Sequence, residues 1–262
     1  MARKIVITSG KGGVGKTTVT ACLGRALASL GERVVVIDGD IGLNNLDVLL
    51  GIDKRVVFDV IDVIEGRCRL RQALIEDVEE KNLFVLPSAH SYDSSKFCGQ
   101  NMKEIVLRLS HMFDYVLVDC PAGIESGFKR SVASCDEAII VTTPHISALK
   151  DAETVMNILR TNGITNEFIV VNRVRGDLIA SGESLTKIDI EKILNNDVYA
   201  MIPEEDDLNF LSNATSSGYS CGYAACIALA RGLRSGVPEL YDFSEKYRGI
   251  FGKIRRRLKR KL

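Results

Sequence analysis

The chain has 262 residues, enough to bury one large core, and its 46% hydrophobic and 26% charged residues are typical of a soluble globular protein. It contains no apolar run of about 18 residues, which excludes a membrane-spanning helix, and its first apolar stretch is too short for a signal peptide. The formal net charge is zero. Seven cysteines, an odd number without a C-x-x-C pair, are expected to be reduced thiols rather than metal ligands. We therefore expect a cytoplasmic protein.

Short apolar runs alternate with longer segments of helical periodicity. Strands are predicted at residues 4–8, 34–37, 83–86, 115–118, 137–141, 167–171 and 198–202. Helices are predicted at residues 16–30, 102–112, 147–162, 187–195 and 222–234. This alternation predicts an α/β fold with a mostly parallel sheet flanked by helices on both faces. One domain is expected over residues 1–240, with a hinge near Pro238 leading into residues 241–262.

Residues 10–17 read GKGGVGKT, between the first predicted strand and the first predicted helix. In the pattern G-x-x-x-x-G-K-[ST], glycines let backbone N–H groups surround phosphate oxygens at the positive end of a helix dipole. Lys16 is expected to reach the β- and γ-phosphates, and the Thr17 hydroxyl to bind Mg²⁺. A glycine turn without a ligand is the alternative. The predicted nucleotide-binding residues here are Gly10, Lys11, Gly12, Gly13, Val14, Gly15, Lys16, Thr17 and Thr18.

The additional lysine inside this loop, Lys11, resembles the signature of the deviant-Walker ATPases, a family that includes MinD, ParA and the nitrogenase iron protein. The resemblance implies a three-layer P-loop NTPase fold, hydrolysis of ATP, and Mg²⁺ as cofactor. It also implies that the signature lysine contacts nucleotide phosphates across a dimer interface. Lys11 is therefore a candidate for linking ATP binding to formation of a homodimer. A solvated loop lysine is the alternative.

Acidic residues come directly after two of the predicted strands: Asp38 and Asp40 after residues 34–37, and Asp119 after residues 115–118. Ligands bind at the carboxyl ends of strands in open parallel sheets. By the resemblance, Asp119 is the Walker B carboxylate near Mg²⁺, and Asp38 and Asp40 belong to switch I. We expect Asp40 to position the attacking water, and Thr17, Asp38 and Asp119 to form the metal shell. Capping of a helix by Asp38 or Asp40 is the alternative.

The identity of the base is predicted from the residues immediately after the strand at 167–171. The N-K-x-D segment with which P-loop GTPases read guanine is missing there, because the chain continues with Asn172 and Arg173. Asn172, together with Pro203 and Glu204, resembles the adenine-holding elements of MinD-like proteins. ATP is therefore favoured over GTP.

The C-terminal segment is strongly basic. Nine basic and no acidic residues lie between 246 and 262, so residues 1–245 carry a net charge of minus nine. On a helical projection its apolar residues form a stripe of about 120° on an otherwise basic surface, a pattern typical of a helix that lies in a membrane interface. A disordered end, a nucleic-acid-binding arm and docking on the acidic body are the alternatives. The predicted membrane-contacting residues are Tyr247, Ile250, Phe251, Ile254 and Leu258.

Segments 38–47, 55–59, 119–125 and 202–204, together with the basic tail, resemble the MinD branch of the family. The resemblance implies a membrane switch for placing the division septum, bound to anionic lipid on the cytoplasmic face of the inner membrane. It implies partners of MinC type and of MinE type, or a DivIVA-type system instead, and no nucleic acid. The corresponding surface candidates are Asn45, Asp151 and Glu153. A ParA-like ATPase whose tail binds DNA and a small-molecule P-loop enzyme are the competing hypotheses.

Overall fold

The computed structural model describes residues 2–42, 45–89, 98–205, 220–242 and 247. An eight-stranded sheet in the order β3-β4-β2-β5-β1-β6-β7-β8 forms its centre, and every pairing except β3 with β4 is parallel. The strands are β1 Arg3–Thr8, β2 Val34–Asp38, β3 Ile75–Glu76, β4 Leu83–Leu86, β5 Tyr115–Asp119, β6 Glu137–Thr142, β7 Asn166–Val174 and β8 Val198–Pro203. The predicted α/β fold with a mostly parallel sheet is confirmed.

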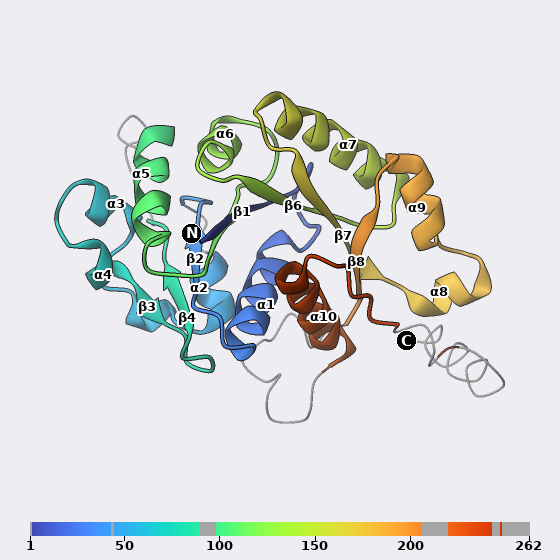
Figure 1. Ribbon diagram of the computed structural model, residues 1–262, viewed down its shortest axis with the longest axis horizontal. Coiled ribbons are helices and arrows are strands. Elements are labelled where there is room, and N and C mark those ends of the chain that lie inside the picture. The colour runs from blue at the N-terminus through green and yellow to red at the C-terminus, as the bar shows by residue number, and fades with distance from the viewer. Residues whose placement is uncertain (1, 43–44, 90–97, 206–219, 243–246, 248–262) are drawn as a thin grey trace.

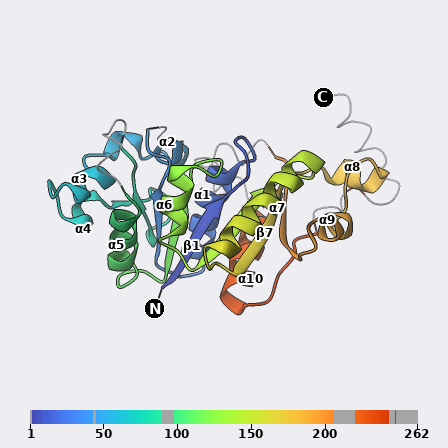
Figure 2. The same cartoon turned by 90° about the horizontal axis from the view of Figure 1, so that it is seen from above.

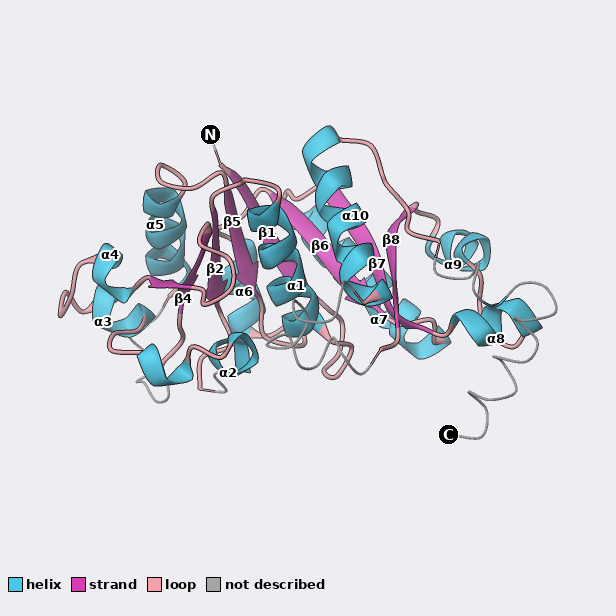
Figure 3. Cartoon of the chain, turned by 90° about the horizontal axis from the view of Figure 1, so that it is seen from below, coloured by secondary structure: helices cyan, strands magenta, loops and turns pink. Residues whose placement is uncertain are grey.

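Helices cover both faces of this sheet, which makes it the middle of three layers (Figure 1). One face carries α5, α6 and α7 (Figure 2), and the other carries α1 and α10, which lie side by side (Figure 3). The helices are α1 Lys16–Ser29, α2 Asn45–Leu50, the 3-10 turn η1 Asp53–Arg55, α3 Val60–Ile64, α4 Leu70–Ala73, α5 Gly99–Leu109, α6 Ser126–Val132, α7 Ile146–Thr161, α8 Gly176–Ser181, α9 Lys187–Leu194 and α10 Cys221–Ser235.

Two hydrophobic cores lie between these layers because successive strand side chains point to opposite faces. In β1, Ile5 and Ile7 belong to the core under α1 and α10, whereas Val6 belongs to the core under α5, α6 and α7. All three side chains are fully buried. Burial on both faces explains why the strands read as nearly continuous apolar runs.

The predicted strands and long helices are all present, and the differences concern their ends and the short elements. The helix predicted at 102–112 is α5, which begins at Gly99 because the Asn101 side chain accepts a hydrogen bond from the Cys98 N–H. β7 continues beyond the predicted residue 171 to Val174. The two-residue strand β3 and the helices of four to seven residues, α2, α3, α4, α6 and α8, are too short to show a period.

The expected hinge lies beyond α10, whose last residue, Ser235, is followed by Gly236 in the left-handed conformation with φ 75°. Most of the expected tail, residues 243–246 and 248–262, lies outside the described residues. In the part of the chain that the structure does describe, we find no helix both long and apolar enough to cross a membrane. The division into a domain at 1–240 and a tail at 241–262 stays a prediction.

Candidate functional site

The carboxyl ends of β1, β2 and β5 bring the predicted site residues together. In the sheet register Asp119 is the partner of Ile7 in β1 and of Asp38 in β2. The Gly39 N–H donates to the Asp119 carbonyl oxygen at 2.9 Å, which ties the segment after β2 to the end of β5. The glycine loop after β1 therefore lies beside both acidic segments, as the sequence predicted.

The loop of residues 10–15 has a backbone that requires glycine. Gly13 and Gly15 have φ of 81° and 88°, in the left-handed region that glycine adopts without strain. A cavity of about 390 Å³ opens on the loop. It is lined by Ser9, Lys11, Gly12, Gly13, Val14, Gly15, Lys16, Thr17, Thr18, Asp40, Asn45, Leu49, Ala122 and Arg173. The predicted loop residues 11–18 thus surround one cavity, and Asp40 and Asn45 join them from neighbouring elements.

A buried ion pair crosses the floor of this site. Lys16 Nζ lies 3.0 Å from Asp119 Oδ1, and the two residues are 7% and 1% exposed. Thr20, one helical turn after Lys16, donates from Oγ1 to the same carboxylate oxygen at 3.1 Å. Burial disfavours the charged ammonium, but attraction by Asp119 prevails and the pKa of Lys16 is raised. Lys16 is therefore held as a cation at the start of α1.

The second carboxylate, Asp38, is buried beside this pair. Burial and the neighbouring charge of Asp119 raise the pKa of Asp38 from 3.8 to about 7. The Asp40 N–H donates to Asp38 Oδ1 at 3.0 Å, a contact that closes a turn rather than capping a helix. Burial also raises the pKa of Asp40, opposed by Lys16. Asp38 and Asp119 are buried carboxylates at paired positions of β2 and β5, and Thr17 follows Lys16 at the start of α1. Their oxygen atoms are of the kind that Mg²⁺ prefers as ligands.

The signature lysine has a different environment from Lys16. Lys11 is exposed, and its Nζ donates to Ser147 Oγ, in the first turn of α7, at 3.3 Å. The same helix meets the loop at a second point, because a Cβ atom added to Gly10 would lie 2.4 Å from the Cβ of Asp151. Of the predicted surface candidates, Asp151 therefore abuts the loop, and Glu153 is exposed on α7. Asn45 is exposed at the first residue of α2 and lines the cavity.

The residues predicted to hold the base lie at the ends of the paired strands β7 and β8, where Pro203 is the partner of Val174. Asn172 is buried beneath the loop, where its Nδ2 donates to the Val14 carbonyl oxygen at 2.8 Å. A second cavity of about 440 Å³ adjoins the loop; its lining includes Glu204, Arg173 and Arg175, with neither Asn172 nor Pro203 among its described residues. Asn172 thus braces the loop in this structure, and its contact with adenine stays a prediction.

Three residues of the site were not predicted. Arg173 lines both cavities and has φ 57°, which is rare for a side-chain-bearing residue. Thr20 contacts Asp119 and Ser147 contacts Lys11. The spacing of four between Lys16 and Thr20 places both on one face of α1 and could have identified Thr20. No local pattern identifies Ser147, because its partner is 136 residues away.

One of the predicted membrane-contacting residues, Tyr247, belongs to the described part of the chain. Its side chain is buried in this structure, with 6% of the residue exposed. Contact of Tyr247 with a membrane stays a prediction. The other predicted membrane residues, Ile250, Phe251, Ile254 and Leu258, lie outside the described residues.

Comparison with known proteins gives the family. The family model described as CobQ/CobB/MinD/ParA nucleotide binding domain matches residues 5–216. The septum site-determining protein MinD of Bacillus subtilis is 44% identical over 262 residues, with 97% of each chain covered. The chain belongs to the MinD family. Two predictions, membership of this family and ATPase activity, are thereby confirmed.

Two solved structures of the family resemble the fold closely. MinD in the MinC:MinD cell division protein complex of Aquifex aeolicus superposes with a TM-score of 0.80 and is 38% identical, covering 89% of this chain and 96% of that one. The MinD of Pyrococcus horikoshii, complexed with Mg-ADP, has a TM-score of 0.78 and 31% identity at the same coverages, 89% and 96%. The chain is thus an ATPase of the class that determines the septum site.

Proposed function

We propose that the chain is a membrane switch in septum placement, which dimerises on ATP, attaches to the membrane through residues 241–262 and recruits a division inhibitor. The observation that carries this proposal is the contrast between the two loop lysines. Lys16 is buried and paired with Asp119, whereas Lys11 is exposed at the rim of the cavity. The phosphate site thus has a second cation, Lys11, which is exposed and is therefore suited to contact a second nucleotide across an interface.

The cavity takes ATP with Mg²⁺. The loop N–H groups and Lys16 would hold the phosphates, and Thr17, Asp38 and Asp119 would hold the ion. When bound, Mg²⁺ neutralises charge on the phosphate oxygens. Asp40 is half-buried in the cavity lining. It would accept a hydrogen bond from an attacking water and orient that water toward the terminal phosphate. Hydrolysis then depends mainly on positioning and charge, which these side chains supply.

The surface beside Lys11 is the proposed docking site for regulators. Asp151 abuts the loop, Glu153 is exposed two residues further along α7, and Asn45 lies at the cavity on α2. A division inhibitor of MinC type is supported by the Aquifex complex, whose MinD is 38% identical to this chain. An activator of MinE type, or a DivIVA-type system, would act on the same surface.

Membrane attachment is the second part of the proposal. The tail carries nine basic residues between 246 and 262 beside its apolar stripe. Each basic residue near an anionic leaflet contributes about 1 kcal/mol. Because only the few apolar side chains of the stripe enter the headgroup region, a single tail binds reversibly. Two tails on one dimer make the second insertion intramolecular and raise avidity roughly 10²- to 10⁴-fold. ATP binding at the loop would thereby place the protein on the cytoplasmic face of the inner membrane.

Flotation with anionic liposomes in ATP and in ADP tests the proposal. We expect binding in ATP that is lost when residues 247–262 are deleted and when Ile254→Gln and Leu258→Gln interrupt the apolar stripe. The matched control, Lys253→Gln with Lys259→Gln, introduces the same two amides outside the stripe and should weaken binding less. Equal binding in both nucleotides would contradict the switch. ATP-dependent binding to DNA without lipid binding would support the ParA-like alternative.

A further inference from the structure

A buried arginine lies in the helix that begins at the phosphate loop. Arg25 is in the third turn of α1 and is 2% exposed. A buried guanidinium is tolerated only when its donors are paired, because its charge is removed from water. Its neighbours in α1, Gly24 and Ala26, are small and buried. Packing of the core alone therefore does not explain why a charged side chain occupies position 25.

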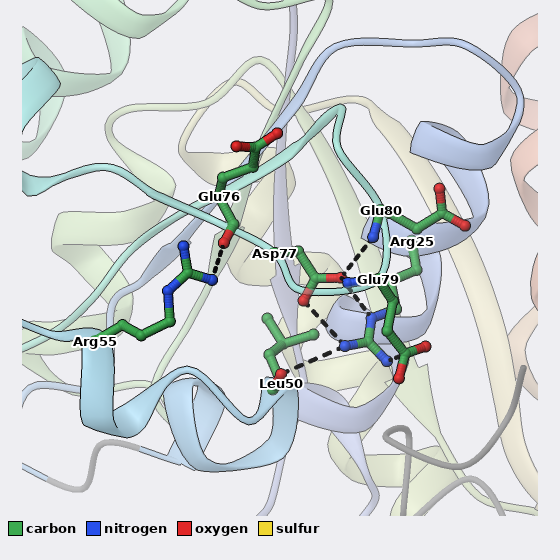
Figure 4. Close-up of polar contacts among 7 residues, drawn as sticks. All are labelled: Arg25, Leu50, Arg55, Glu76, Asp77, Glu79 and Glu80. Atoms are coloured by element: carbon green, nitrogen blue, oxygen red, sulfur yellow. Dashed lines mark hydrogen bonds and ion pairs between the residues drawn. The ribbon is translucent and has the colours of Figure 1, made fainter.

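Asp77, in the turn between β3 and β4, is the main partner of this arginine (Figure 4). Arg25 donates from Nε to Asp77 Oδ2 and from Nη2 to Asp77 Oδ1, both at 3.0 Å, and the Asp77 side chain is 0% exposed. Asp77 Oδ2 also accepts the backbone N–H groups of Glu79 and Glu80 at 3.2 and 3.1 Å. The carboxylate is thus rigidly held, and it fixes the plane of the guanidinium by a bidentate contact.

The same guanidinium contacts the end of α2. Arg25 Nη2 also donates to the carbonyl oxygen of Leu50, the last residue of α2, at 3.4 Å (Figure 4). The carbonyl groups of a last helical turn have no partner within their own helix, and a cation there also interacts favourably with the helix dipole. A helix of six residues is unstable without such tertiary contacts. Arg25 therefore joins the phosphate-loop helix to α2.

The helix α2 also lines the nucleotide cavity. Its first residue, Asn45, and Leu49, the neighbour of the Leu50 that Arg25 contacts, both line that cavity with the phosphate loop. Nη1 of Arg25, in turn, lies 3.3 Å from Glu79 Oε2, on the side of the network away from α2. Arg25, in α1, thus contacts the last residue of α2, and Asp77 fixes the position of the Arg25 side chain.

We propose that Arg25 is a positioning residue for the ATPase site, which holds α2 against α1 so that Asn45 and Leu49 stay at the nucleotide cavity. This inference rests on the proposed function in taking ATP as the ligand of the cavity. The side chains assigned to the chemistry, Lys16, Asp40 and Asp119, lie on α1, after β2 and on β5. Displacement of α2 should therefore affect nucleotide affinity more than the chemical step.

The test compares Arg25→Lys, which keeps the charge but lacks the planar donor fork, with Arg25→Met, which lacks both. Loss of a charged hydrogen bond predicts that KM for ATP with Mg²⁺ rises about five-fold or more in each variant, while kcat changes less than about two-fold. Glu79→Gln, which alters the network on the side away from α2, is the matched control and should leave KM near the wild-type value. Leu109→Ala in α5 controls for lost stability alone.

Hydrogen exchange measures the position of α2 without any reaction. In Arg25→Lys the backbone amides of residues 46–52 should exchange faster than in the wild type, while those of α5 stay unchanged; Leu109→Ala should show the reverse. Unchanged exchange at 46–52, or a KM equal to that of Leu109→Ala, would overturn the positioning role. If the wild type itself binds no ATP, the proposed function fails, but the exchange result still decides whether Arg25 holds α2.

Discussion

Lys16 and Asp119 form a buried ion pair in which Lys16 Nζ lies 3.0 Å from Asp119 Oδ1. The pair joins the first residue of α1 to the last residue of β5, 103 positions apart in the chain. Phosphate and Mg²⁺ would both compete for these groups when nucleotide enters. Each of these two buried charges is therefore compensated by the other in this structure.

Replacing Lys16 should abolish nucleotide binding and destabilise the fold, because the buried carboxylate of Asp119 loses its partner. We expect Lys16→Met to abolish ATP binding in isothermal titration calorimetry and to lower the free energy of unfolding by about 3 kcal/mol. Adding Asp119→Asn should recover part of that stability but not the binding. Lys4→Met, which breaks an ion pair with the exposed Asp136, is the control and should cost less than about 1 kcal/mol. Wild-type affinity in Lys16→Met would refute the assignment.

Asp40 is expected to act in hydrolysis and not in binding. Asp40→Ala should bind ATP and dimerise, while kcat falls by roughly 10²-fold because the water is no longer oriented. Phosphate release and equilibrium binding of a fluorescent ATP analogue measure the two quantities. Asp53→Ala, in η1, removes an exposed acidic group that does not line the cavity and should leave kcat unchanged. Normal turnover in Asp40→Ala would remove Asp40 from this role.

Substitution of Lys11 should affect dimerisation, whereas substitution of Lys16 should affect nucleotide binding. Lys11→Ala is expected to keep nucleotide affinity within about three-fold of wild type, because Lys11 is exposed and pairs with Ser147 rather than with Asp119. Analytical ultracentrifugation with ATP should then show monomers in place of dimers. Lys150→Ala removes an exposed lysine from α7 and serves as the charge-matched control. An unchanged ATP dimer in Lys11→Ala would contradict the proposed interface contact.

Asn172 should act on the loop through the Val14 carbonyl oxygen. Asn172→Ala removes its donor, and we expect an unpaired buried carbonyl to cost about 1–3 kcal/mol in unfolding free energy together with weaker nucleotide binding. Thermal unfolding and titration with ADP measure the two effects. Asn166→Ala, at the other end of β7, removes a more exposed amide and should affect neither. If Asn172→Ala weakens ADP but not phosphate binding, its role is with the base and not with the loop.

The raised pKa of Asp38 predicts that the stability of the protein depends on pH. Because burial raises its pKa from 3.8 to about 7, the folded protein keeps a proton that the unfolded chain releases at lower pH. The contribution to stability is therefore full below about pH 4 and is lost as the pH rises toward 7. Without nucleotide and Mg²⁺, the wild type should lose roughly 3 kcal/mol of unfolding free energy relative to Asp38→Asn between pH 5 and pH 8.

Urea unfolding of both proteins at several pH values measures this difference. Groups distant from Asp38 titrate alike in both proteins, so the comparison reports on Asp38 together with the charges of Asp119, Asp40 and Lys16 that interact with it. Parallel stability profiles for the wild type and Asp38→Asn would show that the carboxylate ionises normally in the folded state. The accompanying control, Asp53→Asn, should track the wild type at every pH because Asp53 is exposed.

The sequence predicts the elements of the site well wherever the chemistry is local. The loop at residues 10–17 needs glycine backbones, a lysine and a hydroxyl in adjacent positions, so its pattern is visible without the fold. Asp38 and Asp119 come directly after apolar runs, and parallel strands bring their ends to one edge. The short helix α2 was missed because six residues carry no clear period.

The phosphate loop, the parallel sheet and the acidic residues at its carboxyl edge can be predicted from the chain alone, because they depend on neighbouring residues and on a single repeating pattern. The contacts between distant residues emerge only when the layers pack. Packing buries Tyr247, turns Asn172 toward the Val14 carbonyl oxygen and sets Ser147 against Lys11. It also joins Arg25 to Asp77 and Leu50. Such pairings depend on the relative placement of whole elements, and no local period in the chain records them.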